Sequence, residues 1–345
     1  MKERIAVAMS GGVDSSVAAA LLKSRGLEVI GLTMCFDFAH HVIKDAKRVA
    51  KKLNIRHYTL NMQDALHRYV IKDFCQEYIQ GRTPNPCVRC NKFIKFDCLL
   101  KKAFSLGARY LATGHYAKVT KSQSHKVTGY LLKKAKDKHK DQSYFLYRLN
   151  QQQLEHILFP LGDYTKEEVR KMAKSLGLGV AEKRASQEIC FLPNQDYRGF
   201  LKENISGHIE SGPIVDKNGN ILGEHKGIAF YTIGQREGLG IAKGYPLYII
   251  KIDPARNEIT VGTKEDALKK EFLVKEASFV CESIKKKVVL KVKIRYNHKE
   301  TLAQILPIKN KIKVKFKKAQ FAITPGQSAV FYDKDMVVGG GIIEV

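Results

Sequence analysis

The first third of the chain alternates short apolar runs with stretches of helical spacing. The apolar runs predict buried strands, and they are "RIAVAM" (4–9), "LEVIGLTM" (27–34), "RHYTLNM" (56–62) and "ARYLATGH" (108–115). Apolar positions with helical spacing lie between them, over 13–24, over 42–53 and from about Phe93 onward. This alternation predicts an α/β domain with a doubly wound parallel sheet. Ligands of such sheets bind at the carboxyl ends of the strands.

The pattern changes further along the chain. Helical spacing returns over 151–158 and 166–176, but after about residue 205 glycines, prolines and short β-branched runs dominate, and "DKNGN" (216–220) predicts a hairpin turn. From about residue 272 the strands "VVLKVKIRY" (288–296) and "KIKVKFKKA" (311–319) alternate apolar and basic residues. We therefore predict three domains: an α/β domain over 1–204, a small mixed or β-rich central domain over 205–271 and a C-terminal β-barrel over 272–345.

Charge narrows the class of partner. The 345 residues include 60 Lys and Arg against 34 Asp and Glu, a formal net charge of +26. Such an excess predicts a polyanionic partner, either nucleic acid or an anionic membrane. No apolar run reaches the roughly 18 residues of a membrane span, and residues 1–8 do not resemble a signal peptide. We expect a cytoplasmic protein that binds nucleic acid and not a membrane.

A glycine-containing loop follows the first predicted strand. The segment "MSGGVDSSVAAALL" (9–22) places Gly11 and Gly12 before a helix, where free backbone N–H groups and the helix dipole favour an anion. Kinase and GTPase phosphate loops end in a lysine followed by Ser or Thr, and this loop has no such lysine. It offers the side chains of Ser10, Asp14 and Ser15 instead. A polar helix cap is the alternative reading of the glycines alone.

Three of the seven cysteines have a distinctive context. Cys87 and Cys90 form a C-x-x-C in "GRTPNPCVRCNKFIKFD" (81–97), and Cys190 lies in "ASQEICFLPNQDYRGFL" (185–201). A C-x-x-C alone fits half a zinc site, a redox pair or coincidence, and a second one is absent. Arg89, Lys92 and Lys95 add positive charge, which predicts lowered thiol pKa values. We interpret Cys75 and Cys98 as packing residues.

These motifs together resemble a known family. The string from Ser10 to Ser16 is similar to the pyrophosphate loop of ATP pyrophosphatases, which cleave ATP between the α and β phosphates. With it, "GRTPNPCVRCNKFIKF", "ATGHYA", "KDQSYFLYRL", "FPLG", "SQEICF" and "FYTIGQREGLG" resemble, in order, the bacterial tRNA-specific 2-thiouridylases. Those enzymes replace the 2-oxygen of the wobble uridine of tRNA by sulfur. The resemblance spans nearly the whole chain and marks a subtype with cysteine at position 87, where other members have aspartate.

The resemblance implies roles for particular residues. Cys90 would be the nucleophile and Cys190 the cysteine that carries a persulfide. The implied ATP contacts are Ala8, Met9, Ser10, Gly11, Gly12, Val13, Asp14, Ser15, Met34 and Gly114. The implied tRNA contacts are Asn85, Pro86, Cys87, His115, Lys140, Asp141, Gln142, Arg295, Tyr296 and Gln327. The segment 35–41 is shorter than its counterpart in the family, which is the main departure from the family pattern.

The implied chemistry suits these residues. Adenylation turns a uracil oxygen into part of a good leaving group, and a thiol or persulfide can then attack the ring carbon. ATP with Mg²⁺, tRNA and a sulfur-donor protein would be the cofactors and partners. Three alternatives stay open: an iron–sulfur cluster held by Cys87, Cys90 and Cys190, an amide-forming ATP pyrophosphatase acting on a small acid, and an RNA-binding module without catalysis.

Basic residues concentrate near the C-terminus. Residues 283–318 contain 13 Lys or Arg and a single acid, Glu300. Alternation predicts one row of Lys291, Lys293 and Arg295, and a second row of lysines at 311, 313, 315 and 317. Such rows fit a surface that follows phosphates, although lysines that protect an exposed strand edge would look similar. A second basic stretch, 118–141, predicts a hairpin beside the tRNA.

Overall fold

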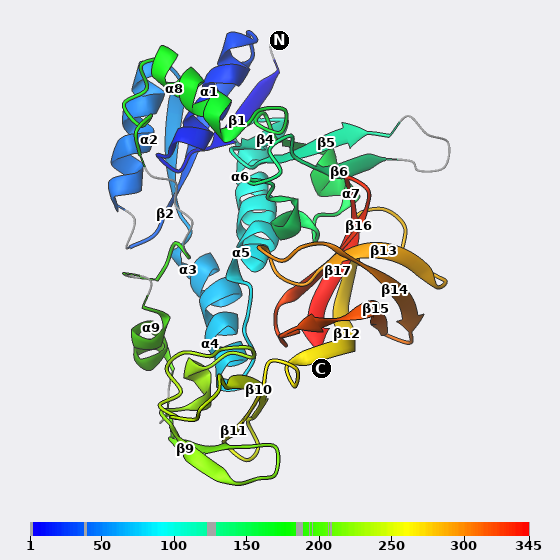
Figure 1. The fold of residues 1–345 in the computed structure, drawn as a ribbon. Coiled ribbons are helices and arrows are strands. Elements are labelled where there is room, and N and C mark those ends of the chain that lie inside the picture. The colour runs from blue at the N-terminus through cyan, green and yellow to red at the C-terminus, as the bar shows by residue number, and fades with distance from the viewer. Residues whose placement is uncertain are drawn as a thin grey trace.

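A five-stranded parallel sheet forms the centre of the N-terminal domain (Figure 1). The computed structural model describes residues 3–37, 40–122, 129–183, 189–192, 194, 196–205, 207 and 209–344. The strand order is β3-β2-β1-β4-β7, so the first strand lies in the middle. The strands are β1 (Arg4–Ala8), β2 (Glu28–Cys35), β3 (Arg56–Asn61), β4 (Tyr110–Thr113) and β7 (Ile157–Leu158). The predicted doubly wound parallel sheet is confirmed.

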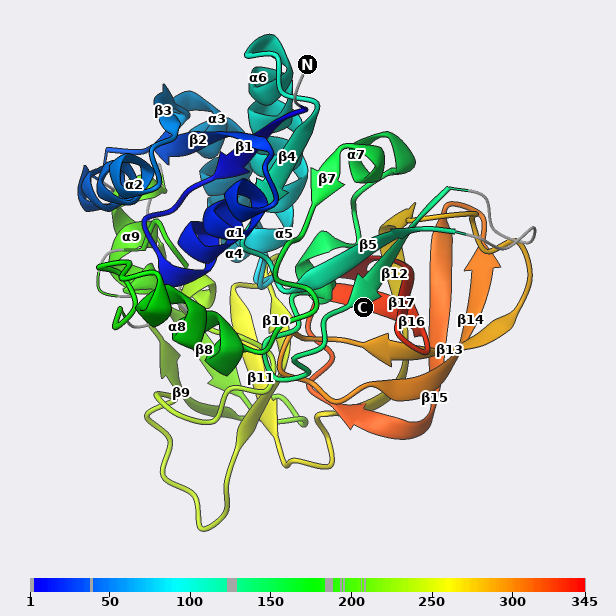
Figure 2. The ribbon, with the colours of Figure 1, turned by 90° about the horizontal axis from the view of Figure 1, so that it is seen from above.

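Helices cover both faces of this sheet, as Figure 2 shows from above. Strand residues alternate between the faces: Ile5 and Val7 enter a core that also contains Val17, whereas Ala6 enters another with Leu99. The first face is covered by α1 (Val13–Ser24), α2 (His40–Lys52) and α8 (Lys166–Ser175). The second is covered by a π-helix, η2 (Cys90–Leu99), and by α6 (Leu100–Ser105). Both faces are therefore buried, as the apolar runs predict.

Two predicted helix boundaries are wrong. Helix α7 (Gln151–Glu155) begins at a capping box of Asn150 and Gln153 and ends before His156, and Ile157 and Leu158 form β7 instead of continuing the helix. The helix expected from Phe93 begins seven residues earlier, as α5 (Pro86–Arg89). The Asn85 side chain accepts a hydrogen bond from the Val88 N–H at 3.3 Å, and proline is well suited to the first helical turn. The C-x-x-C therefore lies at a helix start.

Further short elements complete the N-terminal domain. A hairpin of β5 (Ala117–Lys121) and β6 (Tyr130–Lys134) occupies the predicted place, and its tip lies outside the described residues. The remaining elements are α3 (Gln63–Leu66), η1 (His67–Ile71), α4 (Lys72–Ile79), η3 (Ser143–Leu146) and α9 (Tyr197–Asn204). Helix α4 packs with the central domain, because Phe74 and Tyr78 share one apolar core with Phe230 and Ile249.

The central domain contains a four-stranded sheet. Its order is β10-β11-β8-β9, with β8 (Gly212–Val215), β9 (Ile221–His225), β10 (Tyr248–Asp253) and β11 (Glu258–Gly262), and η5 (Ile228–Phe230) follows β9. The predicted "DKNGN" turn joins β8 to β9 and is confirmed. Asp216 Oδ1 accepts hydrogen bonds from the N–H groups of Asn218, at 2.8 Å, and of Asn220, at 3.0 Å.

Six antiparallel strands close into the C-terminal barrel. They follow the order β12-β15-β14-β13-β16-β17, and β17 pairs back with β12. Their bounds are β12 (Leu268–Phe279), β13 (Val288–Lys293), β14 (Thr301–Ile308), β15 (Lys311–Phe321), β16 (Ser328–Asp333) and β17 (Met336–Glu344). The predicted alternation in β15 is confirmed, since Ile312, Val314 and Phe316 are buried. The predicted row of Lys291, Lys293 and Arg295 on one strand is wrong, because β13 ends at Lys293 and Arg295 lies beyond it.

The barrel and the N-terminal domain share a sheet edge. Met336 of β17 pairs with Lys133 of β6, so the β5–β6 hairpin extends the barrel sheet (Figure 1). One apolar core joins Tyr144 and Tyr147 to Val330 and Tyr332. The contact surface is apolar and continuous, which fixes the barrel against the sheet domain. No helix within the described part of the chain is long and apolar enough to span a membrane.

Candidate functional site

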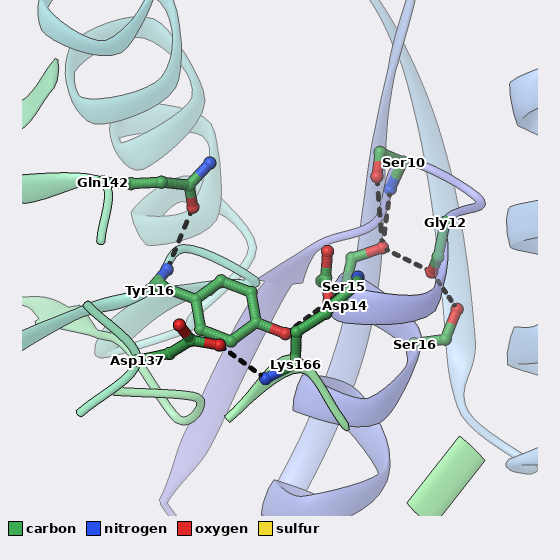
Figure 3. A network of polar contacts seen from close by, with 9 residues as sticks. All are labelled: Ser10, Gly12, Asp14, Ser15, Ser16, Tyr116, Asp137, Gln142 and Lys166. Atoms are coloured by element: carbon green, nitrogen blue, oxygen red, sulfur yellow. Dashed lines mark hydrogen bonds and ion pairs between the residues drawn. The ribbon is translucent and has the colours of Figure 1, made fainter. Parts of the chain in front are cut away.

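The loop after β1 presents unused backbone donors at a helix start. Gly12 is the N-cap of α1 and has no side chain to cap it, so the first N–H groups of the helix stay available to an anion. Within the loop, the Ser10 N–H donates to Ser15 Oγ at 3.1 Å, and Ser16 Oγ donates to the Gly12 carbonyl at 2.7 Å (Figure 3). These bonds fix the shape of the loop and leave the N–H groups at the start of α1 available to an anion.

Two glycines allow the close contacts of this loop. Gly11 has a φ of +63°, and a Cβ there would lie 2.8 Å from the carbonyl oxygen of Val42. A Cβ on Gly114, which follows β4, would lie 2.7 Å from the backbone nitrogen of Ser15. Gly114 therefore brings the carboxyl end of β4 against the start of α1. The predicted ATP residues Ala8 to Ser15 and Gly114 thus lie together, with Met34 at the carboxyl end of neighbouring β2.

Asp14 is held by two residues that the sequence reasoning did not select. Its Oδ1 accepts hydrogen bonds from the Tyr116 hydroxyl, at 2.8 Å, and from Lys166 Nζ, at 2.6 Å (Figure 3). The Lys166 side chain is only 13% exposed. Its backbone N–H donates to Asp137 Oδ2 at 2.9 Å, which fixes the start of α8. The loop itself contains no lysine, but Lys166, 152 positions after Asp14, places its ammonium group beside the loop.

Sequence signals for both residues existed. Tyr116 lies inside the quoted motif "ATGHYA", directly after His115. Lys166 is the first residue of α8, between Thr165 and Glu168, which form a capping box. The sequence does not show the contacts of these residues with Asp14, because only the fold brings their segments to the loop.

The three selected cysteines come together although 100 positions separate Cys90 from Cys190. Loss of hydration is the main cause that raises the pKa of Cys190, and the thiols of Cys90 and Cys87 raise it further, so both lie within electrostatic reach of Cys190. Cys90 packs on an apolar core that contains Phe191 and Leu192, the residues after Cys190. Cys190 is exposed, whereas Cys87 and Cys90 are partly buried. All three are free thiols in this structure.

The predicted lowering of the thiol pKa values is wrong. Loss of hydration raises the pKa of Cys87 to about 11 and also raises the pKa of Cys90. It raises the pKa of Cys190 to about 12 as well, because the surrounding protein displaces water from the thiol although the residue as a whole is exposed. The positive charge of Lys95 acts in the opposite direction on all three but is outweighed. The protein without ligands therefore keeps these thiols protonated near neutral pH.

Lys95 links the cysteines to the ATP loop. Its charge reaches the three thiols and also lowers the pKa of His115, for which burial is the larger cause. His115 follows Gly114, and its Nδ1 lies 2.7 Å from Thr113 Oγ1. The His115 ring packs between those of Phe96 and Phe159, at centroid distances of 5.8 Å each. Lys95 is therefore within electrostatic reach both of the three thiols and of the residue that follows Gly114.

The predicted tRNA residues divide into accessible and internal ones. Lys140 and Tyr296 are partly exposed. Asp141 is buried, and its carboxylate accepts hydrogen bonds from the N–H groups of Ala135, at 3.0 Å, and Ser143, at 3.3 Å. Gln142 Oε1 accepts a hydrogen bond from the Tyr116 N–H at 3.0 Å. The side chains of Asp141 and Gln142 therefore hold the protein backbone in this structure.

Arg295 and Gln327 also bond to the protein itself. Arg295 Nη2 donates to the carbonyls of Ile233, at 3.1 Å, and Ala322, at 2.9 Å, and also to Thr324 Oγ1. It thus joins the central domain to the barrel, and burial lowers its pKa. Gln327 Nε2 donates to the carbonyls of Thr83 and Pro84, just before Asn85.

Not all barrel lysines are free to meet phosphates. Lys311 pairs with Glu344, and Lys313 pairs with Glu271 at 2.9 Å. Lys293 is half-buried, with its Nζ 5.3 Å from the ring centroid of Tyr296. Within the described ranges, the exposed lysines 291, 317 and 318 form no ion pair. The positive surface is therefore smaller than the sequence count predicts.

No group of three His, Cys, Asp or Glu side chains among the described residues is spaced to hold a metal ion. Cys87, Cys90 and Cys190 interact electrostatically, but their thiols do not converge on one point as common ligands would. Asp14 is the carboxylate beside the anion loop, and its second oxygen, Oδ2, has no hydrogen-bond partner within the described part. Carboxylate and phosphate oxygens suit Mg²⁺, so Asp14 fits an ion that arrives with ATP.

Three protein-family profiles match the chain. Residues 3–194 match the family described as the tRNA methyl transferase HUP domain. Residues 198–263 match the tRNA methyl transferase PRC-barrel domain, and residues 269–343 match the aminomethyltransferase β-barrel domain. The fold and the anion loop thus define the class, a HUP-domain protein with two appended β-rich domains.

Whole-length relatives give the family. The chain is 51% identical, over all of its length and 98% of the relative, to tRNA-specific 2-thiouridylase MnmA 1 of Caldanaerobacter subterraneus subsp. tengcongensis. It is 50% identical, over 99% of both chains, to tRNA-specific 2-thiouridylase MnmA of Halothermothrix orenii. The chain belongs to the tRNA-specific 2-thiouridylase family, and the resemblance seen in its motifs is confirmed. A solved 4-thiouridine synthetase–RNA complex with bound ATP covers 58% of the chain and 49% of its own, with 16% identity and a TM-score of 0.37, too low to support an inference.

Proposed function

We propose that this protein catalyses the ATP-dependent 2-thiolation of the wobble uridine of tRNA. The observation that carries the proposal is the electrostatic interaction of Cys87, Cys90 and Cys190, which lie far apart in the sequence, in a chain 51% identical to a named 2-thiouridylase. An amide-forming enzyme would use the same loop but has no need of three thiols placed together. The high positive charge supports a polyanionic substrate.

In the first half-reaction the uracil 2-oxygen attacks the α-phosphate of ATP, and pyrophosphate leaves. Residues 8–15, Met34 and Gly114 would bind ATP, and the helix start would hold the departing pyrophosphate. Lys166 would add a positive charge at the same place. Mg²⁺ neutralises phosphate charge when it is bound, and Asp14 would hold it on the protein side.

In the second half-reaction sulfur displaces AMP. A sulfur-donor protein would load Cys190 as a persulfide, and the terminal sulfur would attack the activated ring carbon, so that the carbon–oxygen bond to AMP breaks. The Cys90 thiol would then attack the inner sulfur of Cys190, which forms a Cys90–Cys190 disulfide and leaves the outer sulfur on the ring. A thiol reductant must reopen that disulfide, which suits a cytoplasmic site.

The tRNA would contact all three domains. We assign the target base to Asn85, Pro86 and Cys87, and flanking contacts to His115 and to the segment 140–142. Arg295, Tyr296 and Gln327 would contact the tRNA from the barrel side. With boundaries at 204 and 271, the N-terminal domain would carry the chemistry and the barrel would hold the tRNA.

An iron–sulfur cluster on Cys87, Cys90 and Cys190 is a second route to the same product. In that route the three thiolates would hold a cluster, which would supply the sulfur for the adenylated base. Among the described residues these three thiols do not form a group spaced to hold a metal ion, which favours the persulfide route.

The test is pyrophosphate release from ATP with and without tRNA, together with mass spectrometry of the digested tRNA. We expect pyrophosphate release that depends on tRNA and a uridine that gains sulfur in place of oxygen. Pyrophosphate release without any RNA would overturn the proposal in favour of a small-molecule ligase.

A further inference from the structure

Thr83 lies four residues before Cys87 and contacts both other domains. Its backbone N–H donates to the Pro325 carbonyl of the barrel at 2.9 Å, and its own carbonyl accepts from Gln327 Nε2 at 3.0 Å. Its hydroxyl donates to Thr232 Oγ1 of the central domain at 3.0 Å. Every polar group of Thr83 is therefore bonded to a residue outside the N-terminal domain.

The barrel side of this contact is a rigid turn, residues 324–327. The Gly326 N–H donates to the Ile343 carbonyl at 3.0 Å, and the Gln327 carbonyl accepts from the Ile343 N–H at 2.8 Å. Gly326 has a φ of +88°, and a Cβ there would lie 2.9 to 3.0 Å from the carbonyl oxygen, carbonyl carbon and nitrogen of Thr83. The turn is thus anchored to β17 and packed directly on the backbone of Thr83.

Little freedom remains between this contact and the cysteines. Pro84 and Pro86 fix two backbone φ angles. Pro84 is bonded to the turn through its carbonyl, which accepts from Gln327 Nε2 at 3.1 Å. Asn85 caps the helix that carries Cys87. A shift of Thr83 would therefore be passed on to Cys87 and Cys90 and not absorbed by a flexible linker.

We propose that the turn 324–327 and Thr232 are positioning elements of the reaction, which act through Thr83 to set the place of the two cysteines. The barrel then does more than hold tRNA, because it completes the geometry in which sulfur is transferred. This inference rests on the proposed thiolation and extends it to residues that touch no reacting atom. Gln327, in this view, positions the catalytic segment whether or not it also contacts tRNA.

The test compares two glycine substitutions of equal local strain. Gly326→Ala places its methyl group against Thr83. Gly219→Ala is the control, because Gly219 has a φ of +86° and no atom within 4 Å of its Cβ position. Single-turnover thiolation would be measured at saturating tRNA and ATP, and tRNA affinity would be measured separately. A thermal melt shows that each variant is folded.

We expect Gly326→Ala to slow the single turnover at least tenfold, with tRNA affinity within about threefold of wild type, and Gly219→Ala to change neither. Equal rates for the two variants would overturn the proposal. So would a loss of tRNA affinity as large as the loss of rate, because the turn would then only bind tRNA. If the wild-type protein forms no 2-thiouridine, the proposed function fails, and that result is separate.

If Gly326→Ala does not fold, two milder substitutions at Thr232 test the same positioning role through the contact of Thr232 with Thr83. Thr232→Val removes the hydroxyl partner of Thr83, whereas Thr232→Ser retains it. We expect a several-fold slower turnover for Thr232→Val and rescue by serine. In the valine variant alone we also expect faster alkylation of Cys87 and Cys90 by iodoacetamide, because the segment that holds these partly buried thiols is less restrained. A valine variant that matches the serine variant in both measurements would contradict the link.

Discussion

The Tyr116 hydroxyl donates a 2.8 Å hydrogen bond to Asp14 Oδ1 and so joins the segment after β4 to the first turn of α1, across 102 positions. Burial and the Asp14 carboxylate both raise the pKa of Tyr116, so the phenol stays a hydrogen-bond donor at any physiological pH. Lys166 contacts the same oxygen. The Asp14 carboxylate is therefore oriented from two sides, with its other oxygen left for a ligand.

Tyr116→Phe should leave the Asp14 carboxylate less firmly oriented without changing the fold. A hydrogen bond to a charged group is worth about 1.5–3 kcal/mol, so we expect tRNA-dependent pyrophosphate release at subsaturating ATP to fall roughly 10- to 100-fold. Tyr110→Phe is the control, because Tyr110 lies on β4 and no hydrogen bond of its hydroxyl is found among the described residues. Equal rates for the two variants would show that Asp14 does not depend on Tyr116.

Lys166→Met should weaken ATP binding, because it removes a cation that lies beside the anion loop and is largely shielded from solvent. We expect at least a tenfold higher Kd for ATP, measured by calorimetry. Lys171→Met on the same helix is the control, since Lys171 is exposed and, among the described residues, its ion pair is with Glu167 alone. Unchanged affinity in the Lys166 variant would remove this lysine from the ATP site.

The residues of the anion loop could be selected from the sequence, because the glycine requirement, the helix start and the strand before it are local. Gly11 and Gly12 lie where the pattern predicts them, and α1 has the predicted bounds. Tyr116 and Lys166 could not be selected in this way, because their contact with Asp14 is created by the strand order. Strand order follows from the packing of both sheet faces, and neither the motif around Tyr116 nor the capping box around Lys166 indicates a contact with Asp14.

The thiol environment shows a second limit of the sequence. Arg89, Lys92 and Lys95 predict lowered thiol pKa values by their charge alone. The structure pairs Arg89 with Asp73 at 3.1 Å and stacks the Lys92 ammonium on Phe93, so that only Lys95 acts on the three thiols, against a larger effect of burial. Counting charges near a cysteine cannot weigh burial, which depends on residues far away in the chain.

Replacing unpaired barrel lysines should weaken tRNA binding more than ATP binding. We choose Lys291, Lys317 and Lys318 for charge reversal to Glu, and we leave Arg295 in place because it ties the barrel to the central domain. Each lost phosphate contact should reduce the slope of log affinity against log salt by about 0.9. Reversal at Lys226, Lys243 and Lys264 is the matched control, because these lysines of the central domain are exposed and form no ion pair among the described residues. An unchanged salt slope in the barrel variant would place the tRNA elsewhere.

The raised pKa of Cys190, about 12, gives a pH dependence that can be measured. A raised pKa lowers the thiolate fraction at neutral pH, and the fraction then grows about tenfold per pH unit up to the pKa. We expect alkylation of Cys190 by iodoacetamide to accelerate steadily from pH 7 to pH 10 in the folded protein. In denaturant, where an ordinary thiol titrates near about 8.5, the rate should level off by pH 10. A plateau below pH 9 in the folded protein would mean that Lys95 outweighs burial.

The two sulfur routes differ in what they require of Cys87. In the persulfide route Cys190 carries sulfur and Cys90 completes the exchange, so Cys87 only shapes the pocket of the base. Cys87→Asp, the residue of other family members, should then keep at least a tenth of the wild-type thiolation. Cys90→Ser and Cys190→Ser should lose activity at least a thousandfold, because a serine hydroxyl forms no persulfide and attacks sulfur poorly. Thiolation is measured by mass spectrometry of tRNA digests.

The cluster route makes the opposite prediction for the same three variants. All three thiolates would be iron ligands, and neither a carboxylate nor a hydroxyl replaces a thiolate well on an iron–sulfur cluster. Assays are therefore run anaerobically, with iron and sulfide supplied, and visible absorption is recorded for each variant. Cys75→Ser is the control for stability, because Cys75 is a buried packing residue outside the site. Retained activity of Cys87→Asp without visible absorption supports the persulfide route, since no thiol at position 87 is then needed. A Cys87→Asp variant as inactive as Cys190→Ser, with wild-type melting and with visible absorption lost together in both, would overturn it.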